Sequence, residues 1–237
     1  LDDARERLQQ RLEERGLAGA GRADQAEQPA ATVGEQVFDA RQRVGGEFHG
    51  ADSTRRGDNV AMNTPDTLRL ETLEGETGPA PRACIIVLHG LGADGNDFVP
   101  IAEELDLSAV GPLRFVFPHA PVRPVTINGG YRMRAWYDIL GADLQRREDE
   151  AGLRESCAAI MALLDRERER GVAANRIVLA GFSQGCAMTL MAGLRYGERL
   201  AGLAGMSGYL PLADTTAAER SAANRDVPIF LAHGTQD

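Results

Sequence analysis

The sequence predicts an α/β fold, in which a mostly parallel sheet carries helices on both faces. Short apolar runs, which are typical of strands buried on both faces, alternate with longer amphipathic patterns from residue 68 onward. No internal repeat interrupts this alternation. One apolar run also leads through a glycine-containing turn directly into a helix-forming segment. This order of strands and crossover helices is the pattern of a parallel sheet.

The expected elements follow one another closely along the chain. Residues 68–73 alternate apolar and polar side chains, as a half-exposed edge strand does. The longest helix, at residues 150–171, joins an apolar stretch to Arg and Glu residues with i,i+4 partners. A shorter amphipathic helix is expected at residues 96–105. Strands are expected at residues 84–88, 113–117, 177–180, 203–207 and 228–232, of which those at 84–88 and 177–180 are expected to be buried.

Composition favours one soluble domain with an appendage. The chain has 237 residues, of which 43% are hydrophobic, and a formal net charge of -9. Its apolar runs are too short for a membrane span, and the acidic balance disfavours nucleic-acid and anionic-membrane partners. Cys84, Cys157 and Cys186 show no C-x-x-C spacing, which disfavours a zinc site and indicates reduced core thiols. Because no signal-peptide pattern opens the chain, we expect a cytoplasmic protein.

Residues 1–61 differ from the rest of the chain. After a charged helical stretch, they are rich in Ala, Gly, Gln, Arg and Asp without a sustained period. A segment of this composition buries too little apolar surface to offset its ordering entropy, so we expect disorder. Met62 directly precedes the first strand-like run, and we interpret it as the natural start of a domain at residues 62–237. The upstream residues are then non-native sequence; an N-terminal interaction arm is the alternative.

The turn after the strand at residues 177–180 has the pattern G-x-S-x-G. Gly181 and Gly185 flank Ser183, and helix-forming residues follow. In this strand–turn–helix context the pattern predicts a nucleophile elbow, in which the tight turn lifts the serine Oγ above the sheet. The backbone N–H of Gln184 then faces a developing oxyanion at the positive end of the helix. A small-residue turn without a catalytic role is the alternative interpretation.

A second glycine-rich turn, at residues 89–98, follows the strand at residues 84–88. A strand, a glycine-rich turn and a helix in this order can present a backbone N–H to the nucleophile, and Leu91 is the candidate donor. His89 is interpreted as structural, because the histidine comes last in the triad order of such sites. The turn lacks both the G-x-G-x-x-G spacing and a P-loop lysine, which disfavours nucleotide binding.

The two turns together resemble those of the phospholipase/carboxylesterase family of α/β-hydrolases, which includes acyl-protein thioesterases and small bacterial carboxylesterases. The matching stretches run in family order: IVLHGLGADGNDF (86–98), FPHAP (117–121), AWYDI (135–139), LAGFSQG (179–185), SGYLP (207–211) and AHGTQD (232–237). The resemblance implies the α/β-hydrolase fold and a carboxylesterase-type serine hydrolase. Cys186 departs mildly from the family, which often has glycine at this position.

The resemblance also implies roles for particular residues. Ser183 matches the nucleophile, and the N–H groups of Leu91 and Gln184 match the oxyanion hole. Asp237 matches the aspartate of the H-G-x-x-D stretch, which is the triad acid. No metal or organic cofactor is implied.

Two aromatic residues, Trp136 and Tyr209, match positions near the acyl pocket of the family. Both also fit as ordinary core aromatics, and the sequence leaves the two interpretations open. The expected partner is a small-molecule ester, without nucleic acid or stable membrane insertion, and a homodimer is possible for a hydrolase of this size.

In this family the triad histidine follows the acid, after one more strand. None of the four histidines, His49, His89, His119 and His233, lies beyond Asp237. The sequence is therefore expected to be truncated at its C-terminus, with an exposed sheet edge and marginal stability. Activity is expected to be poor, because a serine without its base retains only the modest catalysis of the oxyanion hole and binding.

The expected function of the complete protein is the hydrolysis of short acyl esters through an acyl-enzyme. Short neutral esters are favoured because the chain offers no basic cluster for a phosphate head group. Acyl-protein thioesterase or lysophospholipase activity is an alternative, as is a lactone or peptide hydrolase on the same fold. A non-catalytic binding protein is the further alternative, if the natural gene ends at Asp237.

Overall fold

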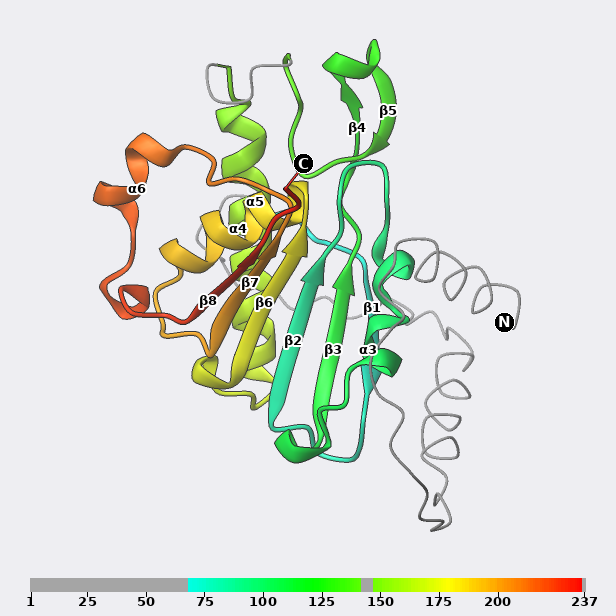
Figure 1. Ribbon diagram of the computed structural model, residues 1–237, viewed down its shortest axis with the longest axis vertical. Helices are drawn as coiled ribbons and strands as arrows, with labels where there is room; N and C mark the ends of the chain where they lie inside the picture. The colour runs from blue at the N-terminus through cyan, green and yellow to red at the C-terminus, as the bar shows by residue number, and fades with distance from the viewer. Residues whose placement is uncertain (1–67, 142–146, 236–237) are drawn as a thin grey trace, which may run out of the picture. The chain divides into compact units, whose positions relative to one another are not determined.

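The computed structural model describes residues 68–141 and 147–235 of the chain, which form a sheet with helices packed against it (Figure 1). The arm expected at residues 1–61, and with it the domain start proposed at Met62, lies outside the described residues. Within the described ranges, no helix has both the length and the apolar character that crossing a membrane requires.

Within the described part of the chain, the main sheet has six strands in the order β1-β3-β2-β6-β7-β8. They are β1 (Thr72–Glu76), β2 (Ala83–Leu88), β3 (Leu113–Pro118), β6 (Ile177–Phe182), β7 (Gly202–Met206) and β8 (Ile229–Ala232). Strand β1 runs antiparallel to β3, and every other neighbouring pair is parallel, which confirms the mostly parallel sheet. Because the parallel strands share one direction, the turns after β2, β6 and β7 meet at one edge of the sheet.

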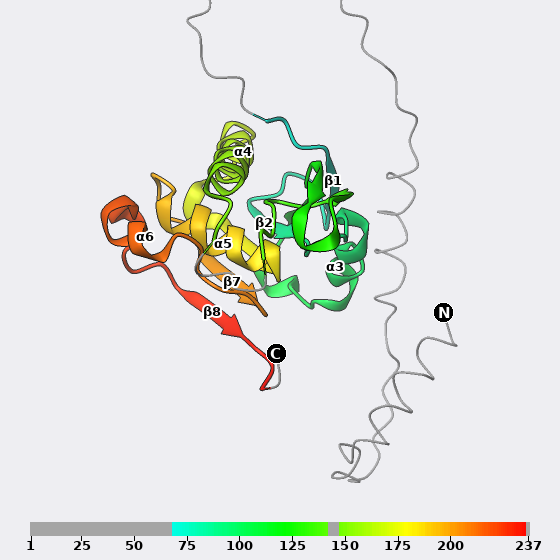
Figure 2. The same cartoon turned by 90° about the horizontal axis from the view of Figure 1, so that it is seen from above.

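Helices cover both faces of the sheet, as expected, but they do so unequally (Figure 2). Three helices lie on one side: α4 (Glu150–Glu169), α5 (Gln184–Arg195) and α6 (Ala213–Glu219). Their buried side chains form the larger core cluster with sheet residues such as Leu88 and Leu179. On the other side, the described residues place only short helical turns against the sheet, around Phe115 and Phe117.

Some expected elements differ in the structure. The single helix expected at residues 96–105 is two short pieces, a 3-10 turn at Gly95–Phe98 and α3 (Ile101–Glu104). Pro100 lies between them as the N-cap of α3, and its missing N–H cannot continue a helical hydrogen-bond ladder. The edge strand β1 lies a few residues later in the chain than expected. An antiparallel hairpin that the sequence analysis did not predict is formed by β4 (Val122–Val125) and β5 (Tyr131–Arg134).

A buried carboxylate joins the first strands to α4. The fully buried Glu167 accepts hydrogen bonds from Arg114 of β3 at 2.7 Å and from Arg170 at 2.8 Å. Arg114 in turn pairs with Glu76 of β1 at 2.9 Å. Burial acts to raise the pKa of Glu167, but the hydrogen bond from Arg114 and the charge of Arg170 outweigh it and hold the pKa below its ordinary value. The network therefore keeps Glu167 ionised inside the fold.

α5 begins very close to the end of β2. A Cβ added at Gly185 would lie 2.1 Å from the Leu88 carbonyl oxygen, and one at Gly181 would lie 2.2 Å from the Gly185 carbonyl oxygen. Backbone, rather than a movable side chain, occupies both positions, so only glycine fits without displacement. The first turn of α5 is thereby held against the carboxyl ends of β2 and β6.

Replacing Glu167 by Gln is expected to lower the free energy of unfolding by about 3 kcal/mol near neutral pH, because the buried Arg114 then loses one of its two carboxylate partners. The folded-state pKa of Glu167 lies below its ordinary value of 4.5, so its stabilisation is present above pH 4.5 and is lost as the pH falls through the folded pKa. In urea unfolding, the difference between wild type and Glu167→Gln should therefore shrink in acid. A difference independent of pH would contradict this account. The exposed Glu169→Gln on the same helix is the control, expected within about 0.5 kcal/mol of wild type.

Replacing Gly185 by Ala is expected to destabilise the protein by about 3 kcal/mol, because the new Cβ can be accommodated only by moving α5 or β2. The control is Gly75→Ala in β1, where an added Cβ meets nothing within 4 Å. Thermal unfolding of the two variants measures the contrast. Equal melting temperatures for the two would show that α5 can move away from β2 without penalty.

Candidate active site

Ser183 occupies the turn between β6 and α5 in a backbone conformation that L residues rarely adopt. Its φ is 54° and its ψ is -117°, and its side chain is partly exposed. The Ser183 N–H donates to the Met206 carbonyl of β7 at 2.9 Å. Strain of this kind costs on the order of 1–3 kcal/mol, and it persists where the surrounding structure determines it, often at functional sites. The turn has the sharp strand-to-helix geometry that presents a serine above a sheet.

The turn after β2 runs directly beside this serine. A Cβ added at Gly90 would lie 3.3 Å from the Ser183 Cβ, and Leu91 is the next residue along the chain. Within the described residues, the backbone N–H groups of Leu91 and Gln184 have no hydrogen-bond acceptor. For Gln184 this follows from its place in the first turn of α5, where no intrahelical acceptor exists. The structure thus brings Ser183 together with the two backbone N–H groups that the sequence singled out.

His89 lies in the same turn but has no free nitrogen for proton transfer. Its Nε2 accepts a hydrogen bond from the Ala120 N–H at 2.9 Å, so the ring proton is on Nδ1, which donates to the Gly90 carbonyl at 2.7 Å. Burial lowers the pKa of His89, which favours this neutral form. Both ring nitrogens are engaged with backbone, and the geometry supports the structural interpretation of this residue.

Trp136 does not line an open pocket. Its side chain is fully buried, and its ring centroid lies 5.3 Å from that of His89. The indole N–H donates to the His89 carbonyl at 2.8 Å. Of the two interpretations that the sequence left open for Trp136, the structure favours the core position, because no part of the indole is accessible to a substrate.

Tyr209 lies on a loop that adjoins Ser183. It is partly buried on the loop after β7, where burial raises the pKa of its phenol and the phenol pairs with that of Tyr137. A Cβ added at the preceding Gly208 would lie 2.8 Å from the Ser183 carbonyl oxygen, so this loop adjoins the elbow. The proposed place of Tyr209 near a substrate is compatible with this geometry.

The triad acid expected from the sequence, Asp237, lies outside the described residues. The ring hydrogen bonds of His89 and His119 go to backbone groups and not to Ser183 Oγ. His119 is buried beside the glycine-rich turn, where its Nδ1 accepts from the Gly95 N–H at 3.1 Å. His233 directly follows β8. The role of Asp237 therefore stays a prediction.

The three cysteines are free and buried, as expected. Burial, with the nearby charge of Glu167, raises the pKa of the Cys84 thiol to about 12, and burial raises that of Cys157 to about 11. Burial also raises the pKa of Cys186, which lies in the first turn of α5. Protonated, inaccessible thiols do not compete with Ser183 as nucleophiles. Among the described residues, no group of three His, Cys, Asp or Glu side chains could hold a metal ion.

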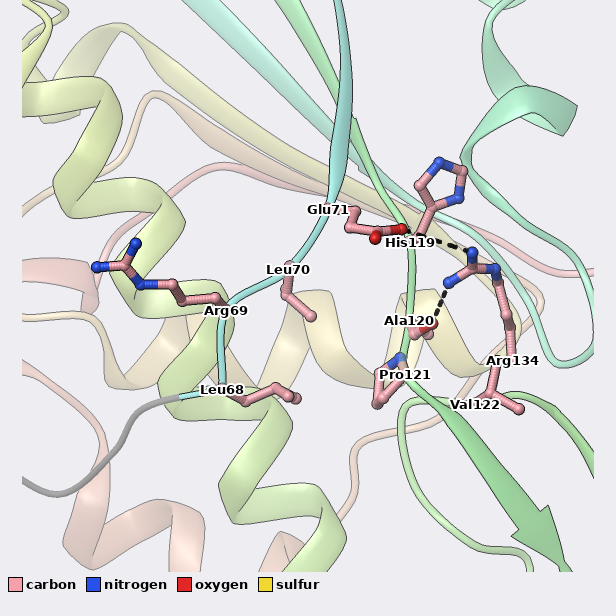
Figure 3. Close-up of a pocket in the computed structure, with 9 residues that line it drawn as sticks. All are labelled: Leu68, Arg69, Leu70, Glu71, His119, Ala120, Pro121, Val122 and Arg134. Atoms are coloured by element: carbon pink, nitrogen blue, oxygen red, sulfur yellow. Dashed lines mark hydrogen bonds and ion pairs between the residues drawn. The ribbon is translucent and has the colours of Figure 1, made fainter. Parts of the chain in front are cut away.

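A cavity of about 340 Å³ opens beside the ends of β1 and β3, and Ser183 does not line it (Figure 3). At its wall, Arg134 donates to the Ala120 carbonyl at 2.9 Å and approaches Glu71 at 3.8 Å. The backbone carbonyl of Arg134 also accepts a hydrogen bond from the Gly92 N–H, in the turn after β2, at 2.9 Å. No motif in the sequence marks Arg134, because its partners come from separate segments of the chain.

Several known proteins match this chain over the residues that carry the site. The profile of the phospholipase/carboxylesterase family matches residues 75–237. Acyl-protein thioesterase 1 of Yarrowia lipolytica is 42% identical over 160 residues, which are 67% of this chain and 70% of the relative. Acyl-protein thioesterase 1 of Schizosaccharomyces pombe is 40% identical over 171 residues, 72% of this chain and 75% of the relative.

Solved structures of related proteins also resemble this chain. The crystal structure of Arabidopsis thaliana SOBER1 superposes with a TM-score of 0.62 at 33% identity, covering 66% of this chain and 75% of that chain. Zea mays acyl-protein thioesterase 2 superposes with a TM-score of 0.55 at 29% identity, covering 70% and 75%. The two curated relatives above are fungal, so the resemblance of the sequence to a small bacterial carboxylesterase stays a prediction. The profile match, the sequence relatives and the shared fold show that this chain belongs to the phospholipase/carboxylesterase family of α/β-hydrolases and is a carboxylesterase-type hydrolase.

Proposed function

We propose that Ser183 is the nucleophile of a hydrolase that cleaves short acyl carboxylic esters through an acyl-enzyme. The observation that carries the proposal is the strained, partly exposed Ser183 at a strand-to-helix turn, beside two backbone N–H groups without acceptors. Donors placed in advance, where negative charge develops, lower the barrier without reorganising in the reaction. A structural turn would need neither the strain nor the unpaired donors.

In the proposed reaction, Ser183 Oγ attacks the ester carbonyl carbon while a histidine base takes its proton. The carbonyl oxygen becomes an oxyanion that accepts hydrogen bonds from the N–H groups of Leu91 and Gln184. The bond to the alcohol oxygen then breaks, and the alcohol leaves with the proton held by the base. Water attacks the acyl-enzyme by the same route and releases the carboxylic acid. Asp237 is proposed to hold the tautomer of the histidine.

The surface beside the serine suits an apolar acyl group. Phe182, which precedes Ser183, is 42% exposed, and its ring centroid lies 6.5 Å from that of Phe98. A Cβ added at Gly90 would meet the Phe182 ring and the Ser183 Cβ at the same distance of 3.3 Å, so this aromatic pair borders the reacting centre. We propose that Phe182 and Phe98 contact the acyl chain, with Tyr209 on the opposite loop.

A thioester substrate is the second candidate, and the names of the two curated relatives, acyl-protein thioesterase 1, favour it. The same nucleophile and oxyanion donors would serve, because ester and thioester cleavage pass through the same kind of tetrahedral intermediate. Values of kcat/KM for an oxygen ester, a thioester and a lysophospholipid with one acyl chain distinguish these substrate classes. The cytoplasmic location and the homodimer stay predictions, as does the domain boundary at Met62.

A fluorophosphonate probe tests the role of Ser183 in protein expressed from the complete natural gene. We expect one phosphonate per chain, carried by the tryptic peptide of residues 177–195, and no labelling in Ser183→Ala. Ser207→Ala is the matched control, because Ser207 directly follows the neighbouring strand β7, also at positive φ, and should label like wild type. Ester hydrolysis should fall by at least about 10³-fold in Ser183→Ala only. Labelling that persists in Ser183→Ala would contradict the proposal.

A further inference from the structure

Residues 134–137 contact both halves of the proposed oxyanion hole. This segment begins at the last residue of β5 and is hydrogen bonded both to the turn after β2 and to Gln184 in the first turn of α5. On one side, the Arg134 carbonyl accepts from Gly92 at 2.9 Å, and the Trp136 indole N–H donates to the His89 carbonyl at 2.8 Å. These two bonds hold the residues on either side of the Gly90–Leu91 peptide. The N–H of Leu91 is therefore positioned from residues 134–137.

On the other side, the same segment holds Gln184 through its side-chain amide. The Gln184 Oε1 accepts from the Trp136 backbone N–H at 3.0 Å, and its Nε2 donates to the Tyr137 carbonyl at 3.0 Å. Gln184 is buried, so the amide has no competing water at its surface. The residue that supplies the second oxyanion donor is thus fixed by two further hydrogen bonds to the same segment.

Trp136 itself is anchored to the rest of the fold. Its carbonyl accepts a hydrogen bond from the buried Ser156 hydroxyl of α4, and its indole packs on the His89 ring. His89 is fixed in turn through the Ala120 N–H. A side chain in this position needs a donor at the far end of a large apolar body, and tryptophan combines the two.

We propose that Trp136 is a positioning residue, which sets the spacing of the Leu91 and Gln184 N–H groups by hydrogen bonding to both halves of the oxyanion hole. The inference rests on the proposed function of Ser183. It assigns to Trp136 a role in the reaction without contact to substrate, in place of the acyl-pocket role that the sequence left open. Trp136 binds the two halves through different groups: its indole N–H bonds to His89 and its backbone N–H bonds to Gln184. A substitution of the side chain can therefore remove the first bond and keep the second.

The experiment uses Trp136→Phe in protein expressed from the complete natural gene. Phenylalanine retains an aromatic ring but lacks the indole N–H, so the His89 carbonyl loses its buried donor while the bonds to Gln184 stay. Displacing one oxyanion donor should lower kcat for an oxygen ester by about 10- to 100-fold, with KM changed less than about threefold. Gln184→Met, which keeps its backbone N–H but loses the side-chain amide, should lower kcat in the same way and serves if Trp136→Phe fails to fold.

A thionoester with the same acyl and leaving groups distinguishes a positioning role from a general loss of structure, because only a positioning role should change the ratio of oxygen-ester to thionoester rates. Its sulfur is a weak hydrogen-bond acceptor, so its rate depends little on the oxyanion hole. We expect the ratio of oxygen-ester to thionoester rates to fall in Trp136→Phe by about the same factor as kcat, roughly 10- to 100-fold. Ile160→Val, a buried change in α4, is the control for lost stability and should lower the melting temperature without changing the ratio.

The outcomes separate this inference from the function on which it rests. Wild type without Ser183-dependent hydrolysis would reject the proposed function, and the inference with it. Active wild type with an unchanged kcat in Trp136→Phe would reject only the positioning role. A parallel fall of both substrates' rates in Trp136→Phe, with the ratio unchanged, would also reject it, because that result reports general loss of structure. A fall in the ratio with KM unchanged supports it.

Discussion

The close approach of α5 to the end of β2 is the contact on which the rest of the site depends. Gly185 lacks a Cβ that would lie 2.1 Å from the Leu88 carbonyl oxygen, and this allows the helix to begin immediately above the sheet. Ser183 must then turn the chain from strand to helix within one residue, which explains its positive φ. The first-turn N–H of Gln184, at the positive end of the helix, faces the same edge. The position of Ser183, its backbone strain and the positive helix end beside it therefore all follow from the close approach of α5 to β2.

The backbone strain at Ser183 is offset by the hydrogen bonds that residues 134–137 make to the neighbouring turns. The strain at Ser183 is of the order of 1–3 kcal/mol. Four hydrogen bonds join residues 134–137 to the two turns, and a buried bond of this kind contributes about 1 kcal/mol net. The two contributions are of similar size, so the network is sufficient to hold the strained turn. Removing one member leaves a buried polar group unpaired, which costs more than the bond itself contributes.

The sequence predicted features that depend on local spacing and missed those that depend on tertiary contact. The strand–turn–helix around Ser183 and the turn at Leu91 were predicted because glycines and apolar runs mark them. Trp136 could not be assigned, because its partners lie far away in the chain and a tryptophan suits a pocket as well as a core. The β4–β5 hairpin was missed although Gly129 and Gly130, both at positive φ, mark its turn. The adjacent glycines are thus a local signal of the turn, but a turn alone does not show which strands it joins.

The site separates the groups that carry charge in the reaction from those that hold its shape. The proposed oxyanion donors are backbone N–H groups, which do not titrate. Their supports are also uncharged: an amide at Gln184, an indole at Trp136 and a histidine whose lowered pKa keeps it neutral. The shape of the oxyanion hole is therefore insensitive to pH wherever His89 stays neutral. It follows that the pH dependence of hydrolysis reports the base that deprotonates Ser183, and not the scaffold around it.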